Sequence, residues 1–447
     1  MQAGTSKPGG LCDLLLGGGL AVVVGFGAAG YHGHHSDLAT QRALVQVRQV
    51  PEAFAGDLLA DHAMAHPSLL LDVLALVPHS APTELLVYAL MMVIVGVFSV
   101  LGARALGCGR WASLWAPVLI VLPRPLLAGN RLLHAAPLAR TAAVALMVGA
   151  LAAVLRGSWK GTGLLLGLCL AVHPSMGLQL AVVLIAAMAT TPSLVRSVPP
   201  MLLLAGAVAA PVLLPWVWLG GALPATDAQG ALMALRSGHH LRALDWSAGG
   251  WGIVAVHLTV VAALCPPARR REVGAMCGAA LVLIGAAVVG DPVRWPELAR
   301  LHLAYAAVVP AILAVLLAGR TQGWWWLAVL PLMVFAERAL VPDVPGGPVQ
   351  WQAPIVGAPL QTAAFPPRCV SDDPWRRIRT GQPVYFSIKD GGEVVGSPAF
   401  AQQWGARLTE LCGPDAAALP DDSRVPGWTR VAARCASAPR CPAVQPY

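Results

Sequence analysis

The sequence predicts an all-α, polytopic membrane protein with about eleven transmembrane helices, followed by a small α/β domain outside the membrane. Charged residues make up only 12% of the 447 residues, about half the share found in soluble domains. The hydrophobic fraction is 57% and the mean hydropathy is +0.66, which is more apolar surface than a soluble core could bury. The apolar residues also stand in uncharged blocks that approach the roughly 20 residues needed to cross the hydrocarbon layer.

The net charge of +8 does not indicate nucleic-acid binding. Most arginines stand singly at the ends of apolar blocks, where they anchor and orient membrane spans. Basic residues are not interleaved with aromatic ones in an RNA-binding pattern, so we expect no nucleic-acid partner. The sequence also lacks a glycine loop followed by Lys-Ser/Thr, which argues against transport driven by ATP through this chain alone.

The first apolar block, residues 11–30, has two interpretations. The small residues Gly27-Ala28-Ala29-Gly30 resemble a signal-peptide cleavage site, whereas the length of the block suits an uncleaved span. We favour the span, and both interpretations place the following loop outside. Later spans are predicted at 84–103, 111–128, 139–156, 198–219, 249–266, 273–290, 299–318 and 323–340.

The uncharged stretch 161–195 decides the topology of everything that follows it. As one helix it would be about 52 Å long, too long for a single crossing. Proline breaks a helix at the preceding residue, so His173-Pro174 divides the stretch into two short spans.

Two independent signals agree with that division. With two spans, the loop carrying Arg269-Arg270-Arg271 falls inside, as the positive-inside rule requires. The tail then falls outside, where its cysteines can form disulfides. We therefore predict an inside N-terminus, a membrane domain of residues 1–341 that includes an outer loop at 31–82, and an outer domain at 342–447. The disulfide candidates are Cys369, Cys412, Cys435 and Cys441, for which three pairings are possible.

Two aspartates of the first outer loop are candidate catalytic residues. The stretch 38–50 predicts an amphipathic helix that lies along the outer interface, with Asp37 at its start and Asp57 beyond its end. A carboxylate held at the lipid–water boundary is suited to deprotonate an acceptor hydroxyl or to hold a metal. The alternative is a solvated polar loop.

In this topology all twelve histidines lie on the outer side or in the outer part of a span. The run His32-Gly33-His34-His35 next to Asp37 suggests His32 and His34 as candidate metal ligands, although no HExxH or spaced CxxC pattern accompanies them. We expect His35 to contribute to a substrate site beside Asp37.

The other candidate substrate-binding residues stand at outer boundaries of the spans. A histidine at a helix break is expected to be buried in protein or to line a water-filled cavity. Arginines near the membrane boundary can bind the phosphate of a lipid-linked donor. The alternatives are a histidine at a hairpin tip and ordinary interfacial anchoring. The candidates are His173, Arg236, His239, His240, Arg242, Arg294 and Arg300.

The tail changes character, because proline, glycine and charge increase and the apolar blocks stop. A short helix is predicted at 373–379 and a strand at 384–388. A turn at 389–392 then leads into a second strand that ends at Val395. One or two disulfides would suit a domain of this size.

Three segments together resemble the C-type membrane glycosyltransferases (the GT-C superfamily), and more closely a poorly characterised bacterial membrane protein family with a His-Pro-x-x-Gly motif. These are His35–Asp57 (an acidic residue, an interfacial helix, then Phe-x-Gly-Asp), Gly167–Gly177 and Arg236–Trp246. The resemblance extends in order over most of the membrane region.

This resemblance implies a multi-pass protein of the bacterial cytoplasmic membrane that transfers a sugar from a polyprenyl-phosphate-linked donor to an acceptor on the outer face. Asp37 matches the first-loop carboxylate that acts as base or metal ligand, with Mn²⁺ or Mg²⁺ as the candidate cofactor. The chain departs from the family in having His34-His35 beside Asp37 instead of a second carboxylate. The alternatives are a transporter or flippase of lipid-linked or polysaccharide precursors, and a non-catalytic assembly or metal-handling protein.

Overall fold

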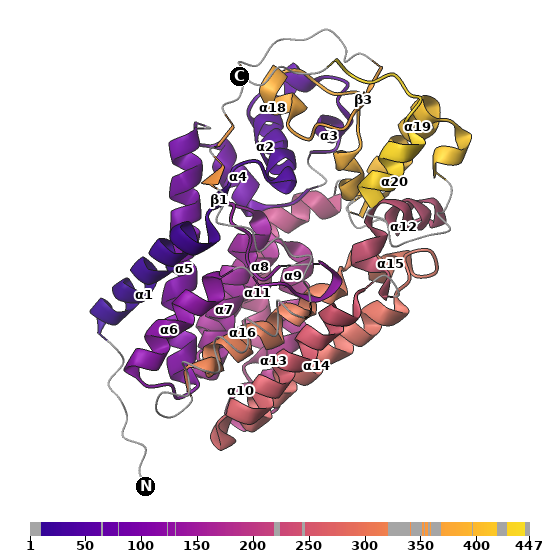
Figure 1. Ribbon diagram of the computed structural model, residues 1–447. Helices are drawn as coiled ribbons and strands as arrows, with labels where there is room; N and C mark the ends of the chain where they lie inside the picture. The colour runs from indigo at the N-terminus through magenta and orange to yellow at the C-terminus, as the bar shows by residue number, and fades with distance from the viewer. Residues whose placement is uncertain are drawn as a thin grey trace.

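The computed structural model is mostly helical, and a disulfide-bonded C-terminal region covers one end of a bundle of apolar helices (Figure 1). Four helices are long and apolar enough to cross a membrane, Leu11–Ala29, Ala81–Ala105, Val198–Trp218 and Pro267–Val289. The structure describes residues 10–63, 66–78, 80–122, 124–129, 131–218, 224–243, 246–320, 340, 351–352, 354–355, 358, 368–395, 397–417 and 427–442.

The bundle combines these long helices with shorter apolar ones. The predicted span 323–340 lies outside the described residues, except for residue 340. The described helices of the bundle are α1 (Leu11–Val24, continued by a π-helical turn Gly25–Ala29), α5 (Ala81–Ala105), α6 (Arg110–Val121), α7 (Ala139–Leu155), α8 (Trp159–Val172), α9 (Pro174–Ala189), α10 (Pro192–Val195), α11 (Val198–Trp218), α13 (Ala248–Leu264), α14 (Arg270–Val289) and α16 (Val308–Ala318).

Small residues allow neighbouring helices of the bundle to approach closely. Gly17 of α1 faces Gly96 of α5, and a Cβ atom on Gly96 would overlap the backbone oxygen of Gly17. A Cβ on Gly167 of α8 would lie 2.7 Å from the backbone oxygen of Ala205 in α11. Close backbone contact through small residues is how apolar helices associate where water does not drive them together.

The predicted break at His173 is present. Helix α8 ends at Val172 and α9 begins at Pro174, with the proline in its first turn, where its missing N–H leaves no hydrogen bond unmade. The hydroxyl of Ser68, a residue of the first loop, donates to the Val172 carbonyl at 2.9 Å. The break therefore lies at the same end of the bundle as the first loop.

Basic residues gather at the opposite end. Asp13 of α1 pairs with Arg104 at 2.5 Å and with Arg110 at 2.9 Å. Arg320, which follows α16, donates to the Leu264 carbonyl at 2.8 Å at the end of α13. The segment that carries Arg269 begins three residues later, so the arginine triplet shares this end.

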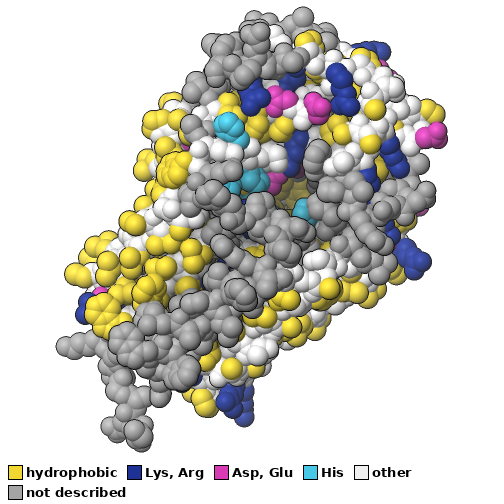
Figure 2. All heavy atoms as spheres, in the orientation of Figure 1, with side chains coloured by type: hydrophobic (Ala, Val, Ile, Leu, Met, Phe, Trp, Pro, Cys, Tyr) yellow, Lys and Arg dark blue, Asp and Glu magenta, His cyan; other side chains and the backbone are white. Residues whose placement is uncertain are grey.

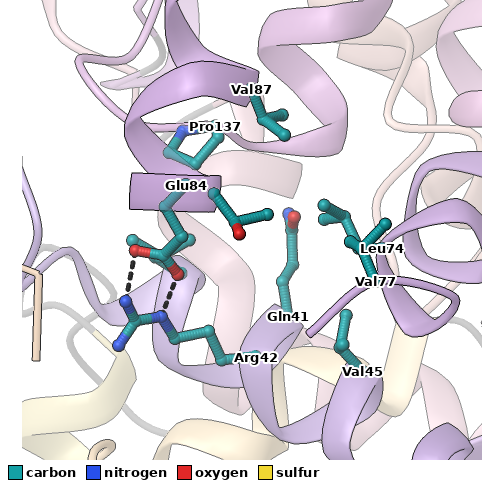
Figure 3. Close-up of a pocket in the computed structure, with 10 residues that line it drawn as sticks. Gln41, Arg42, Val45, Leu74, Val77, Glu84, Val87 and Pro137 are labelled. Atoms are coloured by element: carbon teal, nitrogen blue, oxygen red, sulfur yellow. Dashed lines mark hydrogen bonds and ion pairs between the residues drawn. The ribbon is translucent and has the colours of Figure 1, made fainter. Parts of the chain in front are cut away.

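The first loop folds into a helical layer on the other end of the bundle. It contains α2 (Ser36–Gln49), a 3₁₀ turn (Pro51–Phe54), α3 (Leu58–Asp61) and α4 (Leu69–Ala75). Helix α2, predicted as interfacial, is tied to the bundle by Arg42, whose guanidinium makes a two-pronged ion pair with Glu84 of α5 (Figure 3). The Tyr31 hydroxyl donates to the same carboxylate at 2.9 Å. All three side chains are buried, and the ion pair compensates the cost of removing the two charges from water.

The C-terminal region covers this layer. Two short strands, β3 (Val370–Ser371) and β4 (Phe386–Ser387), pair in parallel, and another parallel pair joins β1 (Tyr31–His32) to β2 (Trp351–Gln352). The helices are α18 (Arg376–Thr380), α19 (Pro398–Cys412) and α20 (Gly427–Arg434). Helix α12 (Asp227–Leu241), from the 220–248 loop, contributes Leu232, Met233 and Leu235 to the same hydrophobic core.

The predicted disulfides form within this region. Cys369 pairs with Cys441 and Cys412 with Cys435, which selects one of the three open pairings. The predicted second strand is wrong, because Lys389–Val395 form a 3₁₀ helix. Backbone carbonyls at both ends of that helix accept hydrogen bonds from α12 side chains, so its polar groups are satisfied without a strand partner.

A buried ion group holds the C-terminal region to the first loop. The Arg377 guanidinium donates to both oxygens of Asp57, at 2.6 and 2.8 Å, and to Asp390 at 2.6 and 3.1 Å. The Val384 and Leu59 backbone N–H groups donate to the same Asp57 carboxylate at 2.7 and 3.0 Å. Asp57 is 0% exposed. Its hydrogen-bonding capacity is therefore used entirely inside the fold.

We predict that Asp57→Asn destabilises the folded protein by about 3–5 kcal/mol, because it leaves Arg377 buried with one of its two carboxylates removed. Thermal or denaturant unfolding of the protein in detergent measures this loss. The matched control is Asp372→Asn, which breaks an exposed pair with Arg440 and should cost less than about 1 kcal/mol. Equal effects of the two substitutions would show that the ion group is not an anchor.

Candidate functional site

The candidate site is a recess at the junction of the bundle, the first loop and the C-terminal region. Figure 2 shows histidine, acidic and basic side chains gathered around a hollow on the upper half of this face, above a mostly hydrophobic lower half. Asp37 lies at the start of α2, and its side chain is 48% exposed. The surrounding protein nevertheless desolvates it. A side chain that is partly exposed and also desolvated by its neighbours lies in a recess of the surface, and we call this recess, which includes Lys389 and His35, the Asp37 recess.

Lys389 from the C-terminal region forms an ion pair with Asp37 across the recess. Desolvation would raise the pKa of Asp37, but the charge of Lys389 and its hydrogen bond to the carboxylate outweigh it and hold that pKa below its ordinary value. The carboxylate is therefore ionised at neutral pH. Lys389 is placed by Arg236 of α12, which donates to the Ile388 carbonyl at 3.1 Å and to the Lys389 carbonyl at 3.4 Å.

Two histidines stand behind the carboxylate. The Asp37 backbone N–H donates to His35 Nδ1 at 3.2 Å, and the His35 and His134 rings meet edge to face with centroids 5.0 Å apart. Burial lowers the pKa of His35 and lowers that of His134 well below its ordinary value. Both rings are therefore neutral at pH 7, and His35 Nδ1 can accept the N–H bond only in that state.

On the bundle side of the recess, Arg140 and Tyr305 lie within electrostatic reach of Asp37, and we call them and the rings packed on Tyr305 the bundle wall. Arg140, at the start of α7, is within electrostatic reach of Asp37, and its guanidinium lies 4.4 Å from the Tyr305 ring centroid. The His302 ring stacks on Tyr305 with centroids 5.2 Å apart, and the His173 ring contacts its edge at 6.1 Å. The predicted candidate His173 is within electrostatic reach of Arg140, as Asp37 is, so all three residues belong to one cluster.

Two residues with left-handed backbone conformation border this wall. Ala128 has φ 59° and His302 has φ 49°, and they are the two such non-glycine residues among those the structure describes. The conformation is unfavourable for residues with a Cβ atom, and such strain concentrates at functional sites. His240 Nδ1 lies 2.7 Å from the Ala128 carbonyl, and Gln179 donates to the Leu301 and His302 carbonyls at 2.8 and 3.1 Å. These hydrogen bonds hold the strained segments in place.

Several predicted site residues have other roles. Asp57 is corrected from a candidate base to a structural residue, because its carboxylate is buried in the Arg377 ion group. Arg236 holds backbone carbonyls and is buried, which argues against a phosphate ligand role. Arg242 pairs with Asp291 at 3.4 Å and Arg300 with Glu297 at 3.5 Å.

The remaining predicted residues are placed as follows. Arg294 is exposed in the turn before α15 (Pro296–Arg300). His239 belongs to α12, but its side chain lies outside the described part of the structure.

The predicted metal ligands do not converge. His32 lines a small pocket with Arg131, whereas the His34 ring faces Trp375 with centroids 6.4 Å apart. Across the described residues, no group of three or more His, Cys, Asp or Glu side chains is arranged to hold a metal ion. The side chains around Asp37 therefore do not fit Mn²⁺ or Mg²⁺ as ligands. The Lys389 ammonium, instead of a metal ion, supplies the positive charge next to the Asp37 carboxylate.

The sequence interpretation missed Lys389 and Glu393, which enter the recess from the C-terminal region. Glu393 pairs with His66 at 3.0 Å and lies within electrostatic reach of Asp37 and Lys389. These residues stand in a segment predicted as a turn and strand of an appended domain. Its Lys-Asp-Gly-Gly-Glu composition marks a polar turn and carries no signal of contact with the first loop.

A comparison with family models, curated proteins and solved structures finds no match for this chain. The likeness to C-type membrane glycosyltransferases therefore rests on the short motifs and on the order of the elements alone.

We predict that Lys389→Met reduces stability at neutral pH and that its effect fades in acid. The pKa of Asp37 is lowered in the folded state, so the ion pair stabilises the protein above the ordinary carboxyl pKa of about 4. That stability is lost as pH falls through the lowered value. Thermal unfolding in detergent from pH 7 to pH 2 should show the gap between the wild-type and variant midpoints narrowing below about pH 4. Lys160→Met, at the opposite end of the bundle, is the control, and a constant gap for Lys389→Met would refute the assignment.

Proposed function

We propose that the protein is a membrane glycosyltransferase that transfers a sugar from a polyprenyl-phosphate-linked donor to an acceptor hydroxyl at the Asp37 recess. The observation that carries the proposal is an accessible, ionised carboxylate in a cation-lined recess at one end of a bundle of apolar helices. A lipid-linked donor requires this combination, because its carrier dissolves in the bilayer while its phosphate and sugar stand at the surface.

The residues of the recess suit the parts of such a reaction. Asp37 would accept the proton of the acceptor hydroxyl as its oxygen bonds to the anomeric carbon of the sugar. The bond from that carbon to the phosphate oxygen breaks, and the electron pair leaves with the polyprenyl phosphate. Lys389 and Arg140 would stabilise the charge that develops on the leaving phosphate.

Donor binding would also free the base. In the absence of donor, the Lys389 ammonium neutralises Asp37 and makes the carboxylate a weak base. A donor phosphate in the recess would attract the ammonium, and the pKa of Asp37 would then rise toward its ordinary value. On this proposal Lys389 couples donor binding to activation of the carboxylate.

The proposed topology has eleven spans, an inside N-terminus and an outside C-terminal region. The ten apolar helices of the described part and the predicted span 323–340 supply that number. Arginines at one end of the bundle and disulfides at the other support the orientation. The recess then faces the outer side of a bacterial cytoplasmic membrane.

The orientation is testable by thiol labelling in intact cells. A membrane-impermeant maleimide should label Cys369, Cys412, Cys435 and Cys441 only after mild reduction. A cysteine introduced at Arg271 should stay unlabelled until the membrane is permeabilised. Labelling of the Arg271→Cys variant in intact cells would reverse the proposed topology.

We predict that Asp37→Asn lowers the rate of sugar transfer at least 100-fold, the lower end of the effect of removing a general base. The assay uses vesicles that contain the purified protein, polyprenyl-phospho-sugar and a panel of acceptors. Asp72→Asn is the matched control, because Asp72 lies in the same loop and is 49% exposed in a pair with Arg48. It should keep full activity, and full activity of Asp37→Asn would refute the base assignment.

A transporter or flippase is the second candidate, and the helix break at His173 favours it because His173 contacts the recess through Tyr305. Movement of a fluorescent polyprenyl-phosphate lipid across the vesicle bilayer, without sugar transfer, would support this alternative over the first.

A further inference from the structure

Helix α4 of the first loop has an exposed apolar face. Val73, Leu76 and Val77 lie on α4 and the turn that ends it, at the i, i+3 and i+4 spacing of one helical face. Their exposed fractions are 50%, 85% and 37%. Leu71 and Leu74, on the other side of α4, pack into the hydrophobic core of the first loop. Two sides of this short helix are therefore apolar, and one of them is uncovered.

Helix α2, which the sequence predicts to lie along the interface, has its apolar side chains inside the protein. None of them is more than 4% exposed, and they are Leu38, Ala39, Ala43, Leu44, Val45 and Val47. A helix binds to a membrane through apolar area that it can insert, and protein already covers this area on α2. The uncovered apolar surface lies instead on α4, which the sequence places only within the outer loop.

The position of α4 along α5 is level with the edge of the hydrocarbon layer. Counted along α5 from Arg104, an ion-paired residue at the basic end of the bundle, a layer of about 30 Å covers about 20 residues and ends near Glu84. Leu74 and Val77 line one crevice together with Val87 of α5 (Figure 3). The end of α4 therefore lies beside the part of α5 that has just entered the hydrocarbon.

The exposed face of α4 stands next to an exposed apolar surface of α5. Beside the crevice, Leu86 is 70% exposed and Leu90, one turn further along, is 56% exposed. Helix α5 is long and apolar enough to cross a membrane, and the side chains that such a span leaves uncovered contact lipid. We propose that α4 is embedded in the leaflet at this end of the bundle and that Val73, Leu76 and Val77 contact the acyl chains of its lipids.

The charged residue of α4 is arranged as this placement requires. Asp72 pairs with Arg48 of α2 at 3.0 Å, so its carboxylate is directed to the first loop and has a counter-charge there. An interfacial helix enters the acyl region by about 5–10 Å with its apolar face, while its charged side stays among polar groups. At that depth the 85% exposure of Leu76 is contact with hydrocarbon, which costs no apolar hydration.

Both ends of α4 are tied to elements that carry residues of the recess. At its start, the Ser68 hydroxyl donates to the carbonyl of Val172, the last residue of α8 before the helix break. At its end, the Gln49 side chain of α2 donates to two backbone carbonyls of the segment 75–77, at 3.2 and 3.0 Å. A helix embedded in lipid and tied in this way holds the recess at the membrane surface. The inference rests on α5 crossing the membrane and does not require sugar transfer.

The test places a fluorescent reporter on α4 of the full chain. Leu76→Cys, Leu86→Cys and Ala406→Cys are made one at a time in a Cys12→Ser background, because Cys12 is the exposed free cysteine and the other free cysteines are buried. Each variant is labelled with an environment-sensitive maleimide dye, without reduction of the disulfides, and reconstituted in phosphatidylcholine vesicles. Leu86→Cys is the control for lipid contact. Ala406→Cys, on the exposed surface of α19, is the control for water.

Two quenchers distinguish lipid from water. We expect phosphatidylcholine with a doxyl group high on its acyl chain to quench the Leu76 reporter about as strongly as the Leu86 reporter, since both lie in the upper acyl region. Aqueous iodide should leave these two reporters largely unquenched and should quench the Ala406 reporter, which the doxyl lipid should not reach.

A Leu76 reporter that responds as the Ala406 reporter does would overturn the proposal. Shielding from both quenchers would also overturn it, because protein and not lipid would then cover α4. Thermal unfolding shows whether each variant is folded, and Val73→Cys supplies a second reporter on the same face if Leu76→Cys is not. A Leu86 reporter that the lipid quencher does not reach would remove the premise that α5 crosses the membrane. Absence of sugar transfer would affect only the proposed function.

Discussion

The Arg377 guanidinium, held between Asp57 and Asp390, joins two parts of the chain that lie more than 300 residues apart. A buried guanidinium is tolerated only when carboxylates and hydrogen bonds replace its water. The C-terminal region must therefore dock with α18 in one position over α2 and α3, as seen at the top of Figure 1. That position sets the path of the Lys389–Val395 segment and brings Lys389 to Asp37.

The recess depends on this docking because its two walls come from different parts of the chain. One wall consists of Arg140, His173, His302 and Tyr305 from the bundle, and the other of Lys389 and Glu393 from the C-terminal region. Asp37 stands between them on a helix that Arg42 and Glu84 tie to the bundle. Loss of either buried ion pair would separate a wall from the carboxylate, so fold stability and site geometry are coupled here.

The two histidines next to Asp37 act as neutral side chains. Burial keeps His35 and His134 uncharged beside Asp37, so the positive charge near the carboxylate comes from Lys389 and the arginines. This distribution suits an anionic ligand, because lysine and arginine stay charged over the whole physiological pH range while a buried imidazole does not.

Apolar block length, the proline after His173 and the position of the cysteines are local properties, so the sequence alone determined the apolar helices, the helix break and a disulfide-bonded tail. Asp37 is a candidate from the sequence for the same reason, because its place before an amphipathic helix is visible there. Only the tertiary structure decided the disulfide pairing, the structural role of Asp57 and the arrival of Lys389 at Asp37. The reason is physical: each depends on which distant groups share a low-dielectric interior, and charge pairing over such separations in sequence leaves no periodic pattern.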